Sequence, residues 1–202
     1  LALAYAARQS DKLSGMVLMG TPAGDFTRTS GLDLIAIVAP EGFDMAPVAN
    51  LIGDAQLDQR ARYCLQLAGT TEARAALRNA LSNGDPAVVY GVLDSLEKLR
   101  DAESVAAIRP LFTHSDPMVR SAALRAVSWT GDVSLVEPFK TAIASATDKS
   151  AFEAYDALLS LAEHIVLRGG NHQVAMNVYR DVLANAKSPV SQAGAMSGLG
   201  RY

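Results

Sequence analysis

The chain has 202 residues, enough for one sizeable hydrophobic core or for a run of five or six small repeats. Half of the residues are hydrophobic and only 6% are aromatic, while alanine is abundant, which favours closely packed helices over sheets. The formal net charge of −3 gives no general electrostatic reason to bind nucleic acid or an acidic membrane. No apolar run is long enough to span a bilayer, and a single cysteine excludes an internal disulfide.

The first part of the chain has no regular pattern. We expect residues 1–30 to form an irregular segment in which any strand is confined to 15–20, followed by helices over 32–38 and 43–52. The stretch LALAYAARQSDKLSGMVLMGTPAG is similar to the segment of α/β-hydrolases that follows the nucleophile elbow. It covers about 24 residues and lacks the G-x-S-x-G motif itself, so the resemblance implies at most a truncated hydrolase segment fused to the rest.

From Asp54 onward the sequence repeats. Asp54, Asp85 and Asp116 are each 31 residues apart, and the same offset aligns several columns of residues. Two columns are hydrophobic, one holds small residues and one is basic. In order they are Leu65, Leu96 and Val127; Leu77, Ile108 and Phe139; Cys64, Ser95 and Ala126; and Arg78, Arg109 and Lys140. Agreement of four columns at one period predicts tandem structural units, with both hydrophobic columns buried.

Each unit is predicted to be a pair of helices. Asp at the start can accept hydrogen bonds from the free N–H groups of a helix, and the proline that follows Asp85 and Asp116 suits the first turn. A turn then leads to a second amphipathic helix, and Pro110 and Pro138 should shift or kink that helix locally. Neither helix alone can bury its apolar stripe, so the units should stack as an all-α solenoid.

After Asp148 the unit lengthens to roughly forty residues. We expect a long helix over 151–167, a break at Gly169-Gly170, and a second helix over 174–183 that together resemble a tetratricopeptide hairpin. Ser188-Pro189 opens another helix. The resulting domain is predicted to cover 31–202, with units near 31–53, 54–84, 85–115, 116–147 and 148–187 and a partial unit at 188–202.

The repeated segments resemble a known family. GDAQLDQRARYCLQL, GDPAVVYGVLDSLEKLRDAESVAAIRPLF and SDPMVRSAALRAVSWTGDVSLVEPF are similar to HEAT repeats of the short bacterial type, over residues 50–202. This family's motifs specify architecture better than function. The resemblance implies a repeat segment that, in large bacterial multidomain proteins, accompanies catalytic or haem-carrying modules. Arg100 departs from the pattern because Gly69 and Gly131 occupy the corresponding turns.

The chemistry-bearing residues make no recognisable constellation. His114, His164 and His172 lack partners at metal-ligand spacing, and Cys64 lies in the small-residue column, where a buried inert thiol is expected. Glycines 194, 198 and 200 do not match a nucleotide-binding fingerprint and are better explained by close helix contacts. We therefore predict no catalytic, cofactor-binding or metal-binding residues, and no enzymatic activity.

The basic column has two interpretations. Arg78, Arg109 and Lys140 could form a strip that docks an acidic peptide, or an internal ladder in which Asp101 and Asp132 accept their hydrogen bonds. We favour the ladder. Three charges in a chain of net charge −3 are poor grounds for expecting nucleic acid.

Three hypotheses for function remain. The leading one is a non-catalytic scaffold that binds a protein or peptide through the surface of its stacked helices. The second is a structural spacer that positions a catalytic or haem-carrying domain outside this segment, and the third is the truncated hydrolase. Because the chain opens at Leu1 without a signal segment, we expect a piece of a larger protein, and the sequence assigns no compartment.

Overall fold

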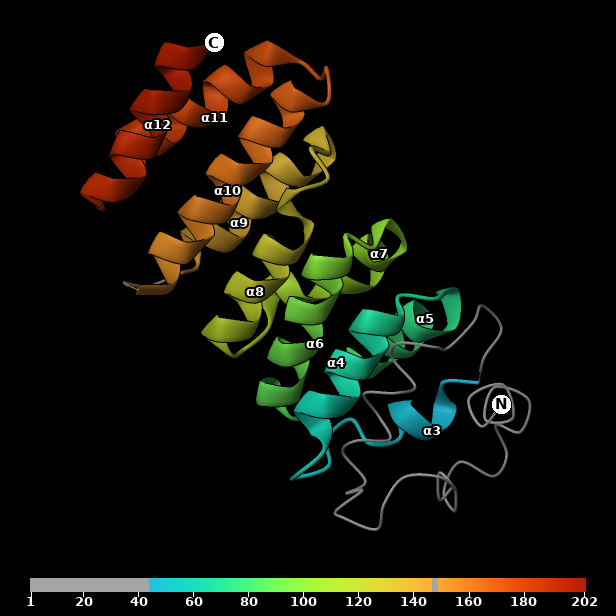
Figure 1. Ribbon diagram of the computed structural model, residues 1–202. Coiled ribbons are helices and arrows are strands. Elements are labelled where there is room, and N and C mark those ends of the chain that lie inside the picture. Colours follow the sequence, from blue (N-terminus) through green and yellow to red (C-terminus); the bar gives the residue numbers. More distant parts are fainter. Residues whose placement is uncertain (1–43, 147–148) are drawn as a thin grey trace, which may run out of the picture. The chain divides into compact units, whose positions relative to one another are not determined.

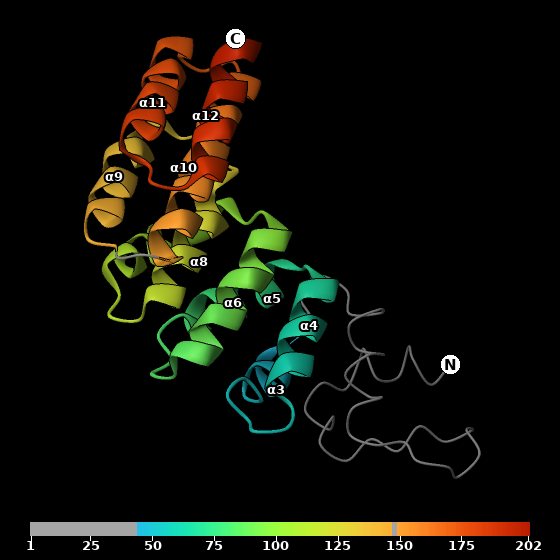
Figure 2. The same cartoon turned by 90° about the vertical axis from the view of Figure 1, so that its left-hand side faces the viewer.

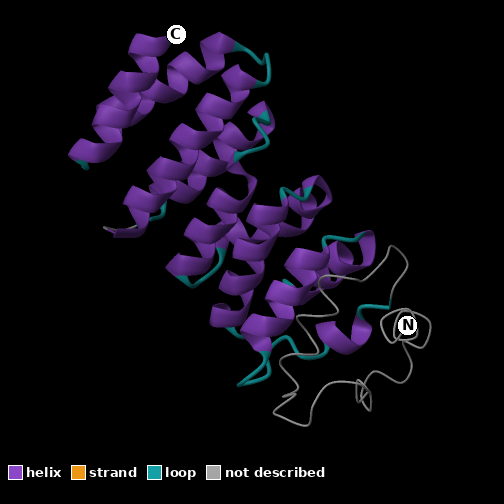
Figure 3. Ribbon diagram, in the orientation of Figure 1, coloured by secondary structure: helices purple, strands orange, loops and turns teal. Residues whose placement is uncertain are grey.

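The computed structural model describes residues 44–146 and 149–202, and these residues form helices joined by short turns (Figure 1). No strand occurs within the described ranges, so the all-α prediction is confirmed there (Figure 3). The segment similar to hydrolases and the expected strand at 15–20 lie outside the described residues. The helices divide into two compact units, one ending at Asp101 and the other beginning at Ala102.

The first unit contains four described α-helices. They are α3 (Ala46–Ala49), α4 (Asp58–Ala68), α5 (Thr71–Ala80) and α6 (Pro86–Leu99). Helix α4 packs against both α5 and α6, and α5 also packs against α6. The expected start at Asp54 is displaced, because the Asp54 carboxylate accepts from Gln56 and Leu57 in a turn and the helix begins only at Asp58. Without a proline after it, Asp54 has no residue that fixes the first helical turn at that point.

The second unit begins with short, partly 3-10 elements and ends with longer α-helices. In chain order these are η2 (Ala102–Ser104), α7 (Val105–Ile108), η3 (Arg109–Thr113), α8 (Pro117–Ser128), η4 (Val133–Leu135), α9 (Val136–Ala144), α10 (Lys149–Leu167), α11 (His172–Asn185) and α12 (Pro189–Arg201). Helix α10 packs against α8, α9, α11 and α12. Figure 2 shows α10, α11 and α12 side by side, as these packing contacts require.

The helix boundaries follow from local capping chemistry. Asp85 and Asp116 accept hydrogen bonds from the first N–H groups of α6 and α8, and Asn171 does the same for α11, as expected for residues of this type. Pro110 coincides with the change from α7 to the 3-10 helix η3. Pro138 is accommodated because α9 begins at Val136, which places the proline in the first turn.

The two hydrophobic columns are buried, as predicted from the 31-residue period. Every member has no measurable exposure, and the small-residue column is buried with them. The fully buried hydrophobic members are Leu65, Leu96, Val127, Leu77, Ile108 and Phe139. Within the second unit the ring of Phe112 lies edge-on to that of Phe139, with 5.3 Å between their centroids. Burial of these side chains is the main stabilising contribution to each unit.

Glycines on α12 serve close packing, which confirms the expectation for two of the three. A Cβ at Gly198 would overlap the ring of Tyr179, and one at Gly194 would lie 3.0 Å from Cδ1 of Leu159. Gly200 has open space beside it and has no such role.

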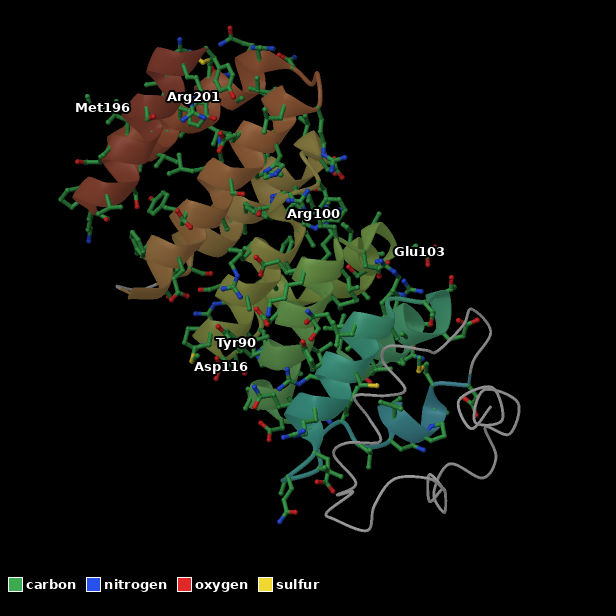
Figure 4. All side chains as sticks on the ribbon, in the orientation of Figure 1. Tyr90, Arg100, Glu103, Asp116, Met196 and Arg201 are labelled. Atoms are coloured by element: carbon green, nitrogen blue, oxygen red, sulfur yellow. The ribbon has the colours of Figure 1, made fainter. Side chains whose placement is uncertain are left out.

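Burial raises the pKa of Tyr179 to about 12, because loss of water destabilises the phenolate. On the same helix Met196 projects outward and is exposed (Figure 4).

Candidate functional site

Arg78, the first residue of the basic column, forms an ion pair within the first unit. Nη1 of Arg78 donates to the Asp101 carboxylate at 2.7 Å, and Nη1 of Arg74 lies 3.7 Å from the other oxygen. Asp101 is almost completely buried, and the Arg78 side chain is only 18% exposed. Two guanidinium groups from α5 therefore neutralise one buried carboxylate at the end of α6. This cluster of Arg74, Arg78 and Asp101 is called the Asp101 cluster below.

Arg74 also holds two turns, and sequence reasoning missed it. Its Nε donates to the carbonyl of Gly69 at the end of α4, and its Nη1 donates to the carbonyl of Leu99 at the end of α6, each at 3.0 Å. These carbonyls are among the acceptors that a helix leaves unsatisfied at its C-terminus. One arginine thus ties the ends of both helices to α5. The 31-residue alignment gave no signal, because Val105 and Val136 stand at the matching positions.

Arg109 has a different environment. It is exposed, and within the described residues it forms no ion pair, neither with Asp132 nor with any other carboxylate. The reason is local: Pro110 follows it, and the chain changes from α7 to η3 at this point. Asp132 is engaged elsewhere, because its carboxylate accepts from the N–H of Ser134 and caps η4. The structure therefore does not bring Arg109 and Asp132 together.

Lys140 pairs with a residue beyond the regular repeats. Its Nζ lies 2.5 Å from the Asp181 carboxylate on α11 and 3.4 Å from that of Glu137 on its own helix. The hydrogen bond to Asp181 raises the pKa of Lys140, and burial opposes this only in part. Of the five residues proposed for the ladder, the structure joins only Arg78 and Asp101. The ladder therefore stops at Arg109, and Lys140 pairs with a carboxylate of the longer unit that follows Asp148.

The surface of the first unit carries a groove between α4 and α6. Its volume is about 470 Å³, and side chains from the two helices line it. From α4 these are Gln59, Arg60, Arg62, Tyr63 and Gln66, and from α6 they are Asp94, Ser95 and Lys98. Tyr63 is 51% exposed, a large fraction for an aromatic side chain on the rim of a groove. We call this feature the α4–α6 groove.

A fixed arginine forms part of the groove wall. Nε and Nη2 of Arg62 both donate to Oδ2 of Asp58, at 3.0 and 2.7 Å. The guanidinium lies over Gly91 of α6, where a Cβ would overlap it. Glycine inside a helix is unfavourable by about 0.5–1 kcal/mol relative to alanine, and here it leaves room for the arginine. Sequence reasoning missed this arrangement because an isolated glycine in a helical pattern does not indicate which side chain packs against it.

A second groove of about 730 Å³ lies between α3 and α5 in the same unit. Short polar side chains and alanines line most of it, and the lining contains neither an aromatic ring nor a basic group. Broad recognition surfaces gain most of their affinity from aromatic and arginine side chains. The α4–α6 groove is therefore the stronger candidate for binding.

The histidines and the cysteine are placed as ordinary structural residues. His114 accepts from the N–H of Asp116 beside the cap of α8, and Nδ1 of His164 lies 2.8 Å from the carbonyl of Ser160 within α10. His172 begins α11, and its ring packs edge-on against that of Tyr202. Cys64 is buried. Among the described residues no group of three or more His, Cys, Asp or Glu side chains is arranged to hold a metal ion.

In the second unit the turn at Thr130-Gly131 lies directly on α10. A Cβ at Gly131 would lie 2.6 Å from the carbonyl oxygen of His164 and 2.8 Å from its carbon. Beside it, Trp129 donates from its indole N–H to the carbonyl of Ala126, and the Arg168 guanidinium lies 5.3 Å from the centroid of its ring. These contacts hold the loop against α10.

None of the helices that the structure describes is both long and apolar enough to cross a membrane. Residues 93–162 match the family model of HEAT repeats. The prediction of HEAT repeats is therefore confirmed for this part of the chain, and with it the class of HEAT-like α-solenoid. HEAT repeats are generally non-catalytic and commonly mediate protein interactions.

Two further comparisons add little to this. A search of the curated proteins finds no match. Among solved structures, the crystal structure of an engineered protein is similar, with 19% sequence identity and a TM-score of 0.49 over 98% of this chain and 88% of that one.

Proposed function

We propose that this chain is a non-catalytic helical-repeat scaffold that binds a segment of a protein partner in the α4–α6 groove. The observation that carries the proposal is the combination of a groove of about 470 Å³ with a half-exposed tyrosine on its rim. Tyrosine offers a large rigid ring and a hydroxyl at low entropic cost, so it is enriched among residues that dominate binding energy. The match of residues 93–162 to HEAT repeats supports the scaffold role more generally.

The groove is also built on rigid elements. Its two walls are helices of 11 and 14 residues, and Arg74 holds the C-terminal end of each one through the carbonyls of Gly69 and Leu99. A preformed surface loses little conformational entropy when it binds a partner. Leu67, 48% exposed on α4, extends the apolar surface one helical turn beyond Tyr63.

The basic column does not serve this proposal as a docking strip. Arg78 is committed to Asp101 and Lys140 to Asp181, so neither presents a free charge on the surface. We propose instead that Arg78, Arg74 and Asp101 stabilise the first unit. Arg109 stays an exposed cation without an assigned role.

Selection from a random peptide library displayed on phage tests the proposal. We expect the selection to yield peptides that bind the wild-type chain. The Tyr63→Ala variant should no longer bind these peptides, because the change removes the aromatic ring from the rim of the groove. Met118→Ala is the matched control, because Met118 is 59% exposed on α8 and does not line the groove. Binding that survives Tyr63→Ala, or that Met118→Ala removes equally, would contradict the proposal. A library that yields no binder would favour the spacer.

A further inference from the structure

We infer that Asn83 and Gly84 form a site of spontaneous covalent modification, at which Asn83 loses its side-chain amide and is converted to aspartate and isoaspartate. The two residues lie in the turn between α5 and α6, and both are exposed. Asn83 is the one asparagine in the sequence that is followed by glycine. The inference is independent of the function proposed above, because this turn does not line the α4–α6 groove.

The reaction consumes water and needs no other reactant. The main-chain nitrogen of Gly84 attacks Cγ of Asn83, so a bond forms between these two atoms. The bond from Cγ to Nδ2 breaks, and ammonia leaves with the proton of the Gly84 N–H, which gives a cyclic imide. Water then adds to one of the imide carbonyl carbons. Cleavage of the bond from the nitrogen to Cγ gives aspartate, whereas cleavage of the bond to the main-chain carbonyl carbon gives isoaspartate.

The turn presents the side chain of Asn83 for this attack. Its Oδ1 accepts a hydrogen bond from the N–H of Asp85 at 2.8 Å. To make this bond, the side-chain amide has to lie along the main chain, beside the Gly84 peptide group. The Asp85 N–H also stabilises the negative charge that develops on Oδ1 as the nitrogen attacks, as the donors of an oxyanion hole do.

Gly84 leaves the attacking nitrogen accessible. A Cβ added at Gly84 would have no neighbour within 4 Å, so the surroundings of this residue are open. Its N–H donates no hydrogen bond to any residue that the structure describes. Glycine also reaches main-chain conformations that a residue with a side chain does not. The nitrogen is therefore held neither by a hydrogen bond nor by steric contact.

Asn171 provides a contrast within the same chain. It is exposed, and its Oδ1 accepts from the N–H of Gln173, two residues later, at 2.9 Å. The residue that follows it is His172, whose ring packs against that of Tyr202. Asn171 therefore has the same type of hydrogen bond as Asn83 but not the glycine. We expect it to react much more slowly, because the side chain of His172 restricts the main chain.

The two products should affect the structure differently. Aspartate keeps a side-chain oxygen that can accept from Asp85, so it leaves the turn intact. In isoaspartate the main chain runs through Cβ and Cγ, which adds a carbon atom to the connection between α5 and α6 and removes the side-chain acceptor. Asp85 is then no longer held in the position from which it caps α6 at the N–H of Ala87. Isoaspartate should therefore destabilise the first unit.

Incubation of the purified chain at mildly alkaline pH tests the inference. Cleavage by trypsin after Arg78 and Lys98 releases a peptide that contains both Asn79 and Asn83. Mass spectrometry detects the conversion as a gain of one dalton, and fragmentation assigns it to a residue. We expect Asn83 to be converted at least about tenfold faster than Asn79 or Asn171, because only Asn83 precedes a glycine. Equal rates would overturn the inference.

Gly84→Ala separates the chemistry from the fold. The open space beside Gly84 accommodates a methyl group, so the variant should fold and melt as the wild type does. Conversion of Asn83 should slow at least about tenfold. Gly200→Ala is the matched control, because it also adds a methyl group in open space but lies on α12. Equal rates of Asn83 conversion in the two variants would contradict the role of Gly84.

The same measurement in urea tests whether the folded turn permits the attack. We expect the folded chain to convert Asn83 at a rate within about tenfold of the unfolded chain, because the side chain is already turned toward the Gly84 peptide group. A folded chain that reacts more slowly than this would overturn the inference, since the fold would then protect Asn83.

Thermal melts test the consequence of the modification. Asn83→Asp should melt as the wild type does, whereas an aged sample that contains isoaspartate should melt about 2–4 °C lower, as expected for a weakened helix cap. Gly84→Ala aged in the same way is the control for other damage and should keep its melting temperature. An aged wild-type sample that melts together with Asn83→Asp would show that isoaspartate does not weaken the start of α6, which would overturn this part of the inference.

Discussion

The turns after α6 and after α8 begin alike and end differently. Arg100 and Gly131 are 31 residues apart, and both adopt the left-handed conformation, with φ of 46° and 63°. Asp101 follows the first and Asp132 the second. Asp101 is buried between two arginines, whereas Asp132 is exposed and caps η4. A repeated sequence position therefore fixes the backbone of the turn, but the neighbouring helix determines what the aspartate does.

The residues at the two left-handed positions are also under different constraints. Gly131 lies against the backbone of α10, so no side chain fits there. Arg100 is exposed, so its side chain is not confined by a neighbouring helix in this way. Gly69, with φ of 59°, is a third case, because a Cβ added there would lie 3.7 Å from its nearest neighbours, which leave room for it.

Gly131→Ala should have the largest effect. It adds left-handed strain and forces the new Cβ against the carbonyl of His164, so we expect a loss of about 3–5 kcal/mol in the free energy of unfolding. Urea denaturation followed by circular dichroism measures this loss. Gly69→Ala is the matched control and should cost only about 1–2 kcal/mol, since it adds strain without a clash. Similar losses for the two variants would show that the close contact with α10 does not matter.

Asp101→Ala should have the second-largest effect on the free energy of unfolding. Removing the carboxylate leaves Arg74 and Arg78 without their shared anion, and we expect a loss of about 2–3 kcal/mol, reduced from that of a fully buried pair because both arginines are partly exposed. The same denaturation measurement applies. A double-mutant cycle with Arg78→Ala should give a coupling energy of about 1 kcal/mol or more. A coupling energy near zero would show that the ion pair in the Asp101 cluster does not stabilise the protein.

Asp132→Ala should cost less, about 1 kcal/mol, because it removes only a cap from a short 3-10 helix. Asp132→Asn keeps a side-chain oxygen that can accept from Ser134, so it should restore most of the loss. If Asp132→Ala destabilised the protein as much as Asp101→Ala, the two aspartates would have equivalent roles after all.

Arg100→Gly should give a small gain. A non-glycine residue in the left-handed region is strained, so glycine should raise the free energy of unfolding by about 0.5–1 kcal/mol. The melting temperature should rise accordingly. A fall instead would mean that the arginine side chain stabilises the turn by more than the strain it adds.

The fold was predictable where the sequence repeats. The columns that contain Leu65 and Leu77 recur at a fixed period, and a periodic apolar pattern reports directly on burial. The ion pairs were predictable only in part. Arg78 and Asp101 recur in the alignment and are joined, but Arg74 has no counterpart in the following repeats.

The candidate groove was not predictable in the same way. Gly91 and Arg62 make their contact through the packing of α4 on α6, and neither position recurs as a column, since Leu93 and Leu124 follow Arg62 at the 31-residue offset. Lys140 and Asp181 are 41 residues apart, a spacing set by the longer unit after Asp148. Contacts that arise once in a repeat array leave no periodic signal.

The contact between Trp129 and Arg168 gives the protein a built-in spectroscopic probe. Trp129 is the single tryptophan of the chain, and it lies within the second compact unit. Intrinsic fluorescence excited at the indole therefore reports on that unit alone, while circular dichroism sums over the helices of both. Unfolding curves recorded by the two methods on one sample would show directly whether the two units melt together or in sequence.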